Sequence, residues 1–170
     1  MTLAQEPLFA DDTASGAVID GPYRYTLWRT WDGRLPVCGW VMLNPSTADA
    51  CADDPTIRRC VGFARRWGFG GIVVRNLFAF RATSPRQLLD AADPVGPDNE
   101  EWLSRWDGVT GVVAAWGTGR WPRLAGDRWR RAAALLAPLG PVCLRAARDG
   151  QPVHPLYQPA HLEPIPWSVP

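Results

Sequence analysis

Polar residues that could bind a ring-shaped ligand follow four apolar stretches of the chain. In order they are Asn44, Asn76, the Trp116-Gly117 pair and His154. A carboxamide is both a hydrogen-bond donor and an acceptor, so Asn76 could read the carbonyl and N–H edge of a pyrimidine base. His154 could donate to a base carbonyl oxygen as negative charge develops there. Asn44 could hold a water molecule near a glycosidic carbon. Together, these three residues predict a base-binding site.

Other residues near these turns could complete such a site. We expect the base to contact Pro45, Ser46, Phe78, Trp116 and Gly117, with the ring of Phe78 or of Phe80 stacked on it. All 18 positive charges of the chain are arginines. Arginine grips phosphate in a bidentate manner, although a GC-rich genome would also explain the absence of lysine. The candidates for phosphate contacts are Arg75, Arg81 and Arg120.

Each polar residue also has an ordinary structural explanation. Asn44, which precedes a proline, could simply satisfy backbone groups of a turn, and Asn76 could do the same at a strand end. His154 could be a hydrogen-bonded structural histidine. Because these residues follow successive strands, we nevertheless favour one shared pocket.

The elements that must position these residues alternate between apolar strands and amphipathic helices. This alternation predicts an α/β fold in three layers, with a central, mainly parallel four-stranded sheet between helices. The expected strands are Val37–Leu43, Ile72–Arg75, Val112–Ala115 and Val142–Ala146. The expected helices begin near Pro55, with Asp53 or Asp54 as its cap, and near Ser84-Pro85, Asn99 and Asp127. Ligands of such sheets bind at the carboxyl ends of the strands, where the polar residues lie.

The rest of the chain indicates a single domain. We expect residues 1–20 to form a flexible tail and residues 21–170 to form one domain of ordinary composition. A hairpin-type turn at Asp32-Gly33 predicts an N-terminal β-hairpin segment that joins the strand beginning at Tyr23 to the next one. No apolar run is long enough to span a membrane and the first residues do not form a signal peptide, so we expect a cytoplasmic protein.

The chain is similar to the uracil-DNA glycosylase superfamily in four motifs that occur in order. MLNPS (Met42–Ser46) stands where these enzymes place their water-activating motif. VVRNLFAFRATSP (Val73–Pro85) resembles the segment with the base-reading asparagine, here Asn76. VVAAWG (Val112–Gly117) resembles an apolar strand that ends in Trp-Gly, and HPLY (His154–Tyr157) resembles the loop that enters the minor groove. The resemblance implies a glycosylase fold and a base-excising activity.

The chain departs from that superfamily at specific positions. Asn44 stands where the most active members carry aspartate, which implies weak activation of water. Ser46 replaces a residue that shapes the pocket floor, and Leu156-Tyr157 replaces Ser-Pro. The segment DDPTI (Asp53–Ile57) has no counterpart. Together, NPSTAD, DDPTIRRC, NLFAFRATSP and HPLY more closely resemble a bacterial and phage family described only as a domain of unknown function.

Three functions are consistent with these residues. The first is a monofunctional DNA glycosylase that flips a modified or mismatched pyrimidine out of the stack and hydrolyses its N-glycosidic bond. The second is a nucleic-acid or nucleotide-binding module without base excision. The third is hydrolysis or transfer on a free nucleoside or nucleotide. We expect no cofactor and no metal, because the cysteines and two histidines match no metal-binding spacing. The expected partner is nucleic acid, with DNA favoured, and the expected state is a monomer.

Overall fold

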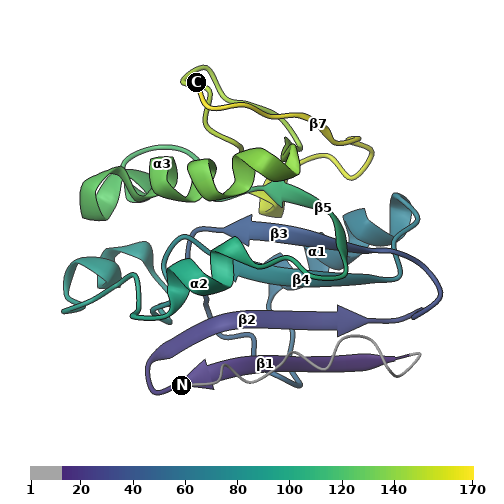
Figure 1. Cartoon of the computed structure of the whole chain (residues 1–170), viewed down its shortest axis with the longest axis horizontal. Coiled ribbons are helices and arrows are strands. Elements are labelled where there is room, and N and C mark those ends of the chain that lie inside the picture. The colour runs from purple at the N-terminus through teal and green to yellow at the C-terminus, as the bar shows by residue number, and fades with distance from the viewer. Residues whose placement is uncertain (1–12) are drawn as a thin grey trace.

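The computed structural model describes residues 13–170, which build one mixed sheet of seven strands (Figure 1). The strand order is β1-β2-β4-β3-β5-β6-β7. The fold is therefore mixed α/β, as expected, but the sheet has seven strands rather than four. Three of its strand pairs are parallel and three are antiparallel, so it is less parallel than the sequence predicted.

The four expected strands form the centre of this sheet and run parallel to one another. They are β3 (Val37–Met42), β4 (Gly71–Asn76), β5 (Val109–Ala114) and the short β6 (Val142–Cys143). Every residue of β3 and of β4 is buried, which is why these strands are nearly continuous apolar runs. Strand β6 ends three residues earlier than predicted.

The outer strands are antiparallel and revise the picture of the N-terminal segment. Residues 14–20 belonged to the expected tail, but they form β1 (Ala14–Asp20), whereas residues 1–12 lie outside the described part. The hairpin joins β1 to β2 (Tyr23–Thr30), with its turn at Gly21-Pro22, and not at Asp32-Gly33. Strand β2 then pairs with β4, which separates it from β3. At the other edge, β7 (Ile165–Pro166) pairs with β6.

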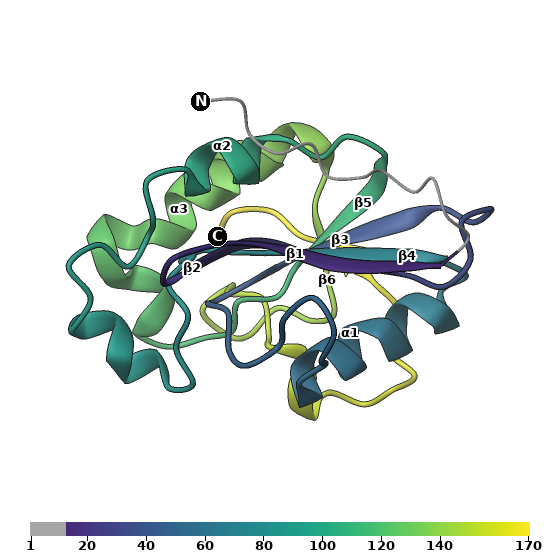
Figure 2. The same ribbon diagram turned by 90° about the horizontal axis from the view of Figure 1, so that it is seen from below.

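Helices cover both faces of the sheet (Figure 2). Helix α1 (Pro55–Arg66) lies on one face, and α2 (Asn99–Ser104) and α3 (Leu124–Leu136) lie on the other. Regular geometry in α3 begins only after Asp127, because residues 125–127 have left-handed backbone angles. Short 3₁₀ helices complete the structure: η1 (Pro85–Leu89), η2 (Trp121–Arg123), η3 (Ala137–Leu139) and η4 (Pro155–Tyr157).

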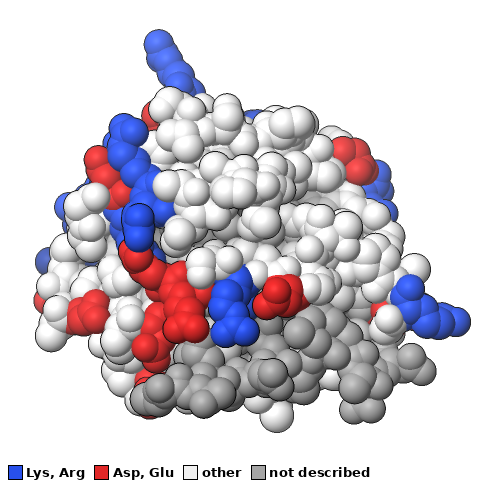
Figure 3. All heavy atoms as spheres, viewed as in Figure 1, with Lys and Arg blue, Asp and Glu red and all other residues white. Residues whose placement is uncertain are grey.

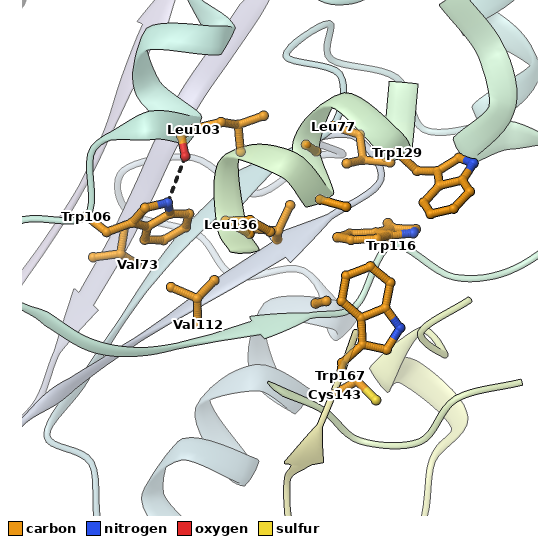
Figure 4. Close-up of a cluster of buried hydrophobic side chains, with 14 of the residues drawn as sticks. Val73, Leu77, Leu103, Trp106, Val112, Trp116, Trp129, Leu136, Cys143 and Trp167 are labelled. Atoms are coloured by element: carbon orange, nitrogen blue, oxygen red, sulfur yellow. Dashed lines mark hydrogen bonds between the residues drawn. The ribbon is translucent and has the colours of Figure 1, made fainter. Parts of the chain in front are cut away.

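Each face of the sheet has its own hydrophobic core. On the side of α2 and α3, Trp116 packs edge-on against Trp167, with ring centroids 5.1 Å apart (Figure 4). In the same cluster the Trp106 indole donates to the Leu103 carbonyl at 2.8 Å. On the side of α1, Trp40 stacks on Trp67 at 5.7 Å. These two cores pack the sheet against the helices on both of its faces.

The strand order indicates where a ligand could bind, at the carboxyl ends of the central strands. Strand β3 lies between β4 and β5. The connection after β3 leads to β4 on one side, and the connection after β5 leads to β6 on the other. A crevice for ligands is expected where neighbouring connections diverge in this way, at the carboxyl ends of the strands. The residues that follow β3 are therefore the natural place to look for a site.

Candidate functional site

A cavity of about 570 Å³ lies at the carboxyl ends of β3 and β4, beside the start of α1 and η4. This volume is in the range of small-molecule sites. Among its lining residues are four that the sequence singled out: Asn44, Ser46, Asn76 and His154. Segments more than 100 residues apart in the chain thus meet at one edge of the sheet.

Asn76, the last residue of β4, has a side chain with no hydrogen-bond partner. The residue is 1% exposed, yet neither its amide nitrogen nor its oxygen is bonded to another protein group. Buried carboxamides almost always have partners, since an unpaired polar group in the interior costs free energy. The backbone around it is held firmly, because Asn99 Nδ2 donates to the carbonyl oxygens of Asn76 and Leu77 at 3.1 and 2.9 Å. The arrangement presents a donor and an acceptor to a ligand.

Asn44 uses its side-chain donors to hold the cavity wall together. Its Nδ2 donates to the Ala82 carbonyl at 2.8 Å and to the Pro45 carbonyl at 3.0 Å. The side-chain nitrogen of Asn44 therefore has the structural role of satisfying backbone carbonyl groups of the loops. Its oxygen accepts none of the hydrogen bonds found in residues 13–170, so Oδ1 remains the group that could hold a water molecule.

His154 precedes η4 and has a defined protonation pattern. Its Nδ1 accepts a hydrogen bond from the Leu156 backbone N–H at 3.3 Å, so the neutral ring carries its proton on Nε2. Burial lowers the pKa of His154 below its ordinary value, with a smaller opposing effect from Asp54. Arg59 of α1 fixes the segment by donating to the carbonyl oxygens of Pro155 and Gln158. The cavity thus gains a neutral imidazole with an N–H available to donate.

Two charged residues at the cavity were not assigned to the site from the sequence. Arg24 of β2 is 2% exposed; its Nη1 donates to the Ala48 carbonyl at 2.5 Å and its buried Nε has no partner. Burial lowers the pKa of Arg24 to about 10, partly offset by Asp54. Asp54 was one of two candidate helix caps in the sequence, and in the structure its Oδ1 accepts from the Ile57 backbone N–H at 2.8 Å. The only sequence feature that could have indicated Arg24 as a site residue was its position among the apolar residues of a strand.

A second hollow and an exposed aromatic ring adjoin the cavity. Ser46, Thr47, Ala82 and Thr83 also line a neighbouring hollow of about 250 Å³, where Arg81 is half-buried with an unpartnered Nε. At another part of the lining, Tyr157 is 89% exposed. Exposed aromatic rings are frequent stacking surfaces for bases.

Four further residues that the sequence predicted for the site are not among those that line the cavity. Phe78 is completely buried in the core on the side of α2 and α3, so it cannot stack on a base in this cavity. Trp116 belongs to the same core and donates to Gln151 Oε1 at 2.9 Å. Gly117 does lie against the site, because a Cβ added there would be 3.5 Å from His154 Cβ. Buried Pro45 supports the wall by accepting from the Ala82 backbone N–H at 2.8 Å.

The expected phosphate-binding arginines also differ in their surroundings. Arg75 is buried, donates to the Trp102 carbonyl at 2.5 Å and lies over the Trp106 ring, so the structure places it in the interior and not in the cavity lining. Arg120 is exposed and lies over the Trp121 ring, outside the cavity lining. Of the three, Arg81 is the one adjacent to the cavity.

Charge is mixed on the face that α2 and α3 cover. Figure 3 shows arginines beside acidic residues there and no continuous basic surface. Glu100, for example, pairs with Arg128 at 3.1 Å and with Arg131 at 2.9 Å. Across residues 13–170, no group of three or more His, Cys, Asp or Glu side chains is placed to hold a metal ion. No helix in that range is long and apolar enough to cross a bilayer.

Comparison with known proteins supports the closer of the two resemblances at the level of the family. No curated protein and no solved structure matches the chain. A family model described as "Protein of unknown function (DUF1643)" matches residues 24–156, a range that holds every cavity-lining residue except Tyr157. Because this match covers most of the chain, the protein belongs to the DUF1643 family.

Proposed function

We propose that the cavity binds a pyrimidine base turned out of nucleic acid and that the protein hydrolyses the N-glycosidic bond of that base. The observation that carries this proposal is the Asn76 side chain, buried and unpartnered at the cavity. A pyrimidine edge, with a carbonyl beside an N–H, would satisfy both of its polar atoms. Apolar lining from Met42, Ile57 and Val74 suits the flat face of a ring.

The other two polar residues suit the steps of hydrolysis. The His154 Nε2–H can donate to a base oxygen as the base leaves with negative charge. The Asn44 oxygen can position a water molecule, while its nitrogen keeps the loop in place. The resemblance of four ordered motifs to the uracil-DNA glycosylase superfamily supports the same assignment of roles, and it also supports a glycosylase-like arrangement of the central strands.

The cavity mouth supports a polymeric substrate over a free nucleoside. Arg81 lies beside the cavity and is half-buried, and its guanidinium group is suited to a backbone phosphate. Tyr157, exposed at the cavity lining, could stack on a neighbouring base. DNA is therefore the proposed partner.

The second candidate is a binding module that holds the base without excising it. One observation favours it: the Asn44 nitrogen is engaged with two backbone carbonyls, and its oxygen carries no charge. A neutral amide oxygen activates water less than a carboxylate does. In this case the protein would bind DNA and leave the glycosidic bond intact.

The test is incubation with oligonucleotides that carry a panel of modified and mismatched pyrimidines. Alkaline cleavage then reveals abasic sites, and fluorescence anisotropy measures binding to the same oligonucleotides. Base release from at least one member supports the glycosylase. Tight binding without release supports the binding module, and neither release nor binding across the panel contradicts both.

A further inference from the structure

The segment DDPTI has no counterpart in the glycosylase motifs, but it lies at the cavity. Asp54 directly precedes α1, and Pro55, Thr56 and Ile57 follow it in the cavity lining. Among the described residues that line the cavity, Asp54 carries the only carboxylate. The negative charge that Asn44 lacks is therefore supplied by another residue that lines the same cavity.

The Asp54 carboxylate is held in a fixed orientation. Its Oδ1 accepts the Ile57 backbone N–H at 2.8 Å, and the residue is 9% exposed. This hydrogen bond uses one carboxylate oxygen. No hydrogen bond within residues 13–170 engages Oδ2, which leaves it available to a water molecule in the cavity.

Asp54 lies among groups typical of a ligand-binding site, in addition to capping a helix. Its charge acts on both Arg24 and His154, which line the same cavity. The independent sign of a ligand is Asn76, a buried carboxamide whose two polar atoms lack partners. A carboxylate, a neutral imidazole and an unsatisfied carboxamide thus line one cavity.

We propose that Asp54 is the catalytic carboxylate of this cavity, an inference that rests on the proposed glycosidic hydrolysis. The bond between the base nitrogen and the sugar C1′ breaks, and its electron pair leaves with the base. The Asp54 carboxylate stabilises the resulting sugar cation and takes one proton from the attacking water, whose oxygen forms the new bond to C1′. The departing base takes a proton from solvent, Asp54 returns its proton to solvent, and the products are the free base and an abasic sugar.

One substitution separates this role from helix capping. Asparagine caps helices about as well as aspartate does, so Asp54→Asn keeps the hydrogen bond to Ile57 and removes only the charge. The matched control is Asp53→Asn, because Asp53 pairs with Arg29 at 2.8 Å and does not line the cavity. Both variants are compared with the full-length wild type on the oligonucleotide that releases base fastest, by single-turnover kinetics.

We expect Asp54→Asn to slow base release by about 10²- to 10⁴-fold, the usual contribution of a general base. Binding of the oligonucleotide should stay near wild type, whereas the melting temperature should fall modestly, because buried Arg24 loses the nearby charge of Asp54. Asp53→Asn should release base at close to the wild-type rate. Asp54→Ser, which also keeps a cap, serves as the second variant if the asparagine variant does not fold, and it should lose the same activity.

The outcomes distinguish this inference from the function on which it rests. If the wild type releases base and Asp54→Asn or Asp54→Ser does so at a similar rate, Asp54 is a cap and the inference is overturned while hydrolysis stands. If the wild type releases no base from any oligonucleotide, hydrolysis is wrong and the role of Asp54 is wrong with it.

Discussion

The side-chain nitrogen of Asn44 lies 2.8 Å from the backbone carbonyl oxygen of Ala82, 38 residues further along the chain. This hydrogen bond joins the loop after β3 to the loop after β4. The same nitrogen also donates to the Pro45 carbonyl. Asn44 therefore closes the wall of the cavity as well as facing its interior.

This relationship changes what Asn44→Asp is expected to do. By resemblance alone, aspartate would retain or raise the rate of base release. A carboxylate, however, cannot donate to the two carbonyl oxygens and would repel them. We expect the free energy of unfolding, measured with urea, to fall by about 1–3 kcal/mol and base release not to accelerate. A variant as stable as wild type with faster base release would contradict this prediction.

Asn76 and Asn99 provide a matched pair of buried asparagines. Asn99 Nδ2 holds two backbone carbonyls, so Asn99→Ala should lower the free energy of unfolding by about 1–3 kcal/mol. The Asn76 side chain has no protein partner, so Asn76→Ala should cost little stability but weaken binding of the target base by about 1–3 kcal/mol. Urea unfolding and anisotropy measure the two effects. Equal losses of stability would show that Asn76 is structural.

His154 should make stability depend on pH. Burial lowers its pKa in the folded protein below the ordinary value of 6.5, so the unfolded chain binds more protons in the interval between the two. Its contribution is fully present above pH 6.5 and is lost as the pH falls towards the folded-state pKa. The slope should reach at most about 1.4 kcal/mol per pH unit. His154→Asn, which keeps a capping side chain, should decline less steeply between pH 7 and 5 in urea titrations.

Arg81 should govern part of the salt dependence of DNA binding. A single phosphate contact contributes about 0.9 to the slope of log affinity against log salt concentration. Arg81→Ala should therefore bind DNA more weakly and lower that slope by about this amount in anisotropy titrations. Arg130→Ala is the control, because Arg130 lies on α3 and pairs with Asp127 at 3.6 Å. Equal slopes for the two variants would remove Arg81 from the interface.

Local sequence determined the elements that depend on neighbouring residues. The apolar runs at Val37, Ile72 and Val112 became the central parallel strands because burial on both faces requires continuous apolar residues. The Asp54-Pro55 pair started α1 because a capping carboxylate and a proline in the first turn are local effects. Asn44, Asn76 and His154 were brought to one cavity because the carboxyl ends of parallel strands share an edge.

Only the tertiary structure decided the pairing of strands and the environment of single side chains. The turn at Asp32-Gly33 looked like a hairpin, but β4 pairs with both β2 and β3 and separates them. Arg75 belongs to the same strand as Asn76, and Phe78 follows that strand. Both are nevertheless buried on the side of α2 and α3, away from the cavity. Arg24 lines the cavity from strand β2, which the sequence did not place in the central sheet. The periodicity of apolar residues in the sequence indicates that a residue is buried. The side chains that it contacts come from distant segments of the chain, so they depend on the whole fold.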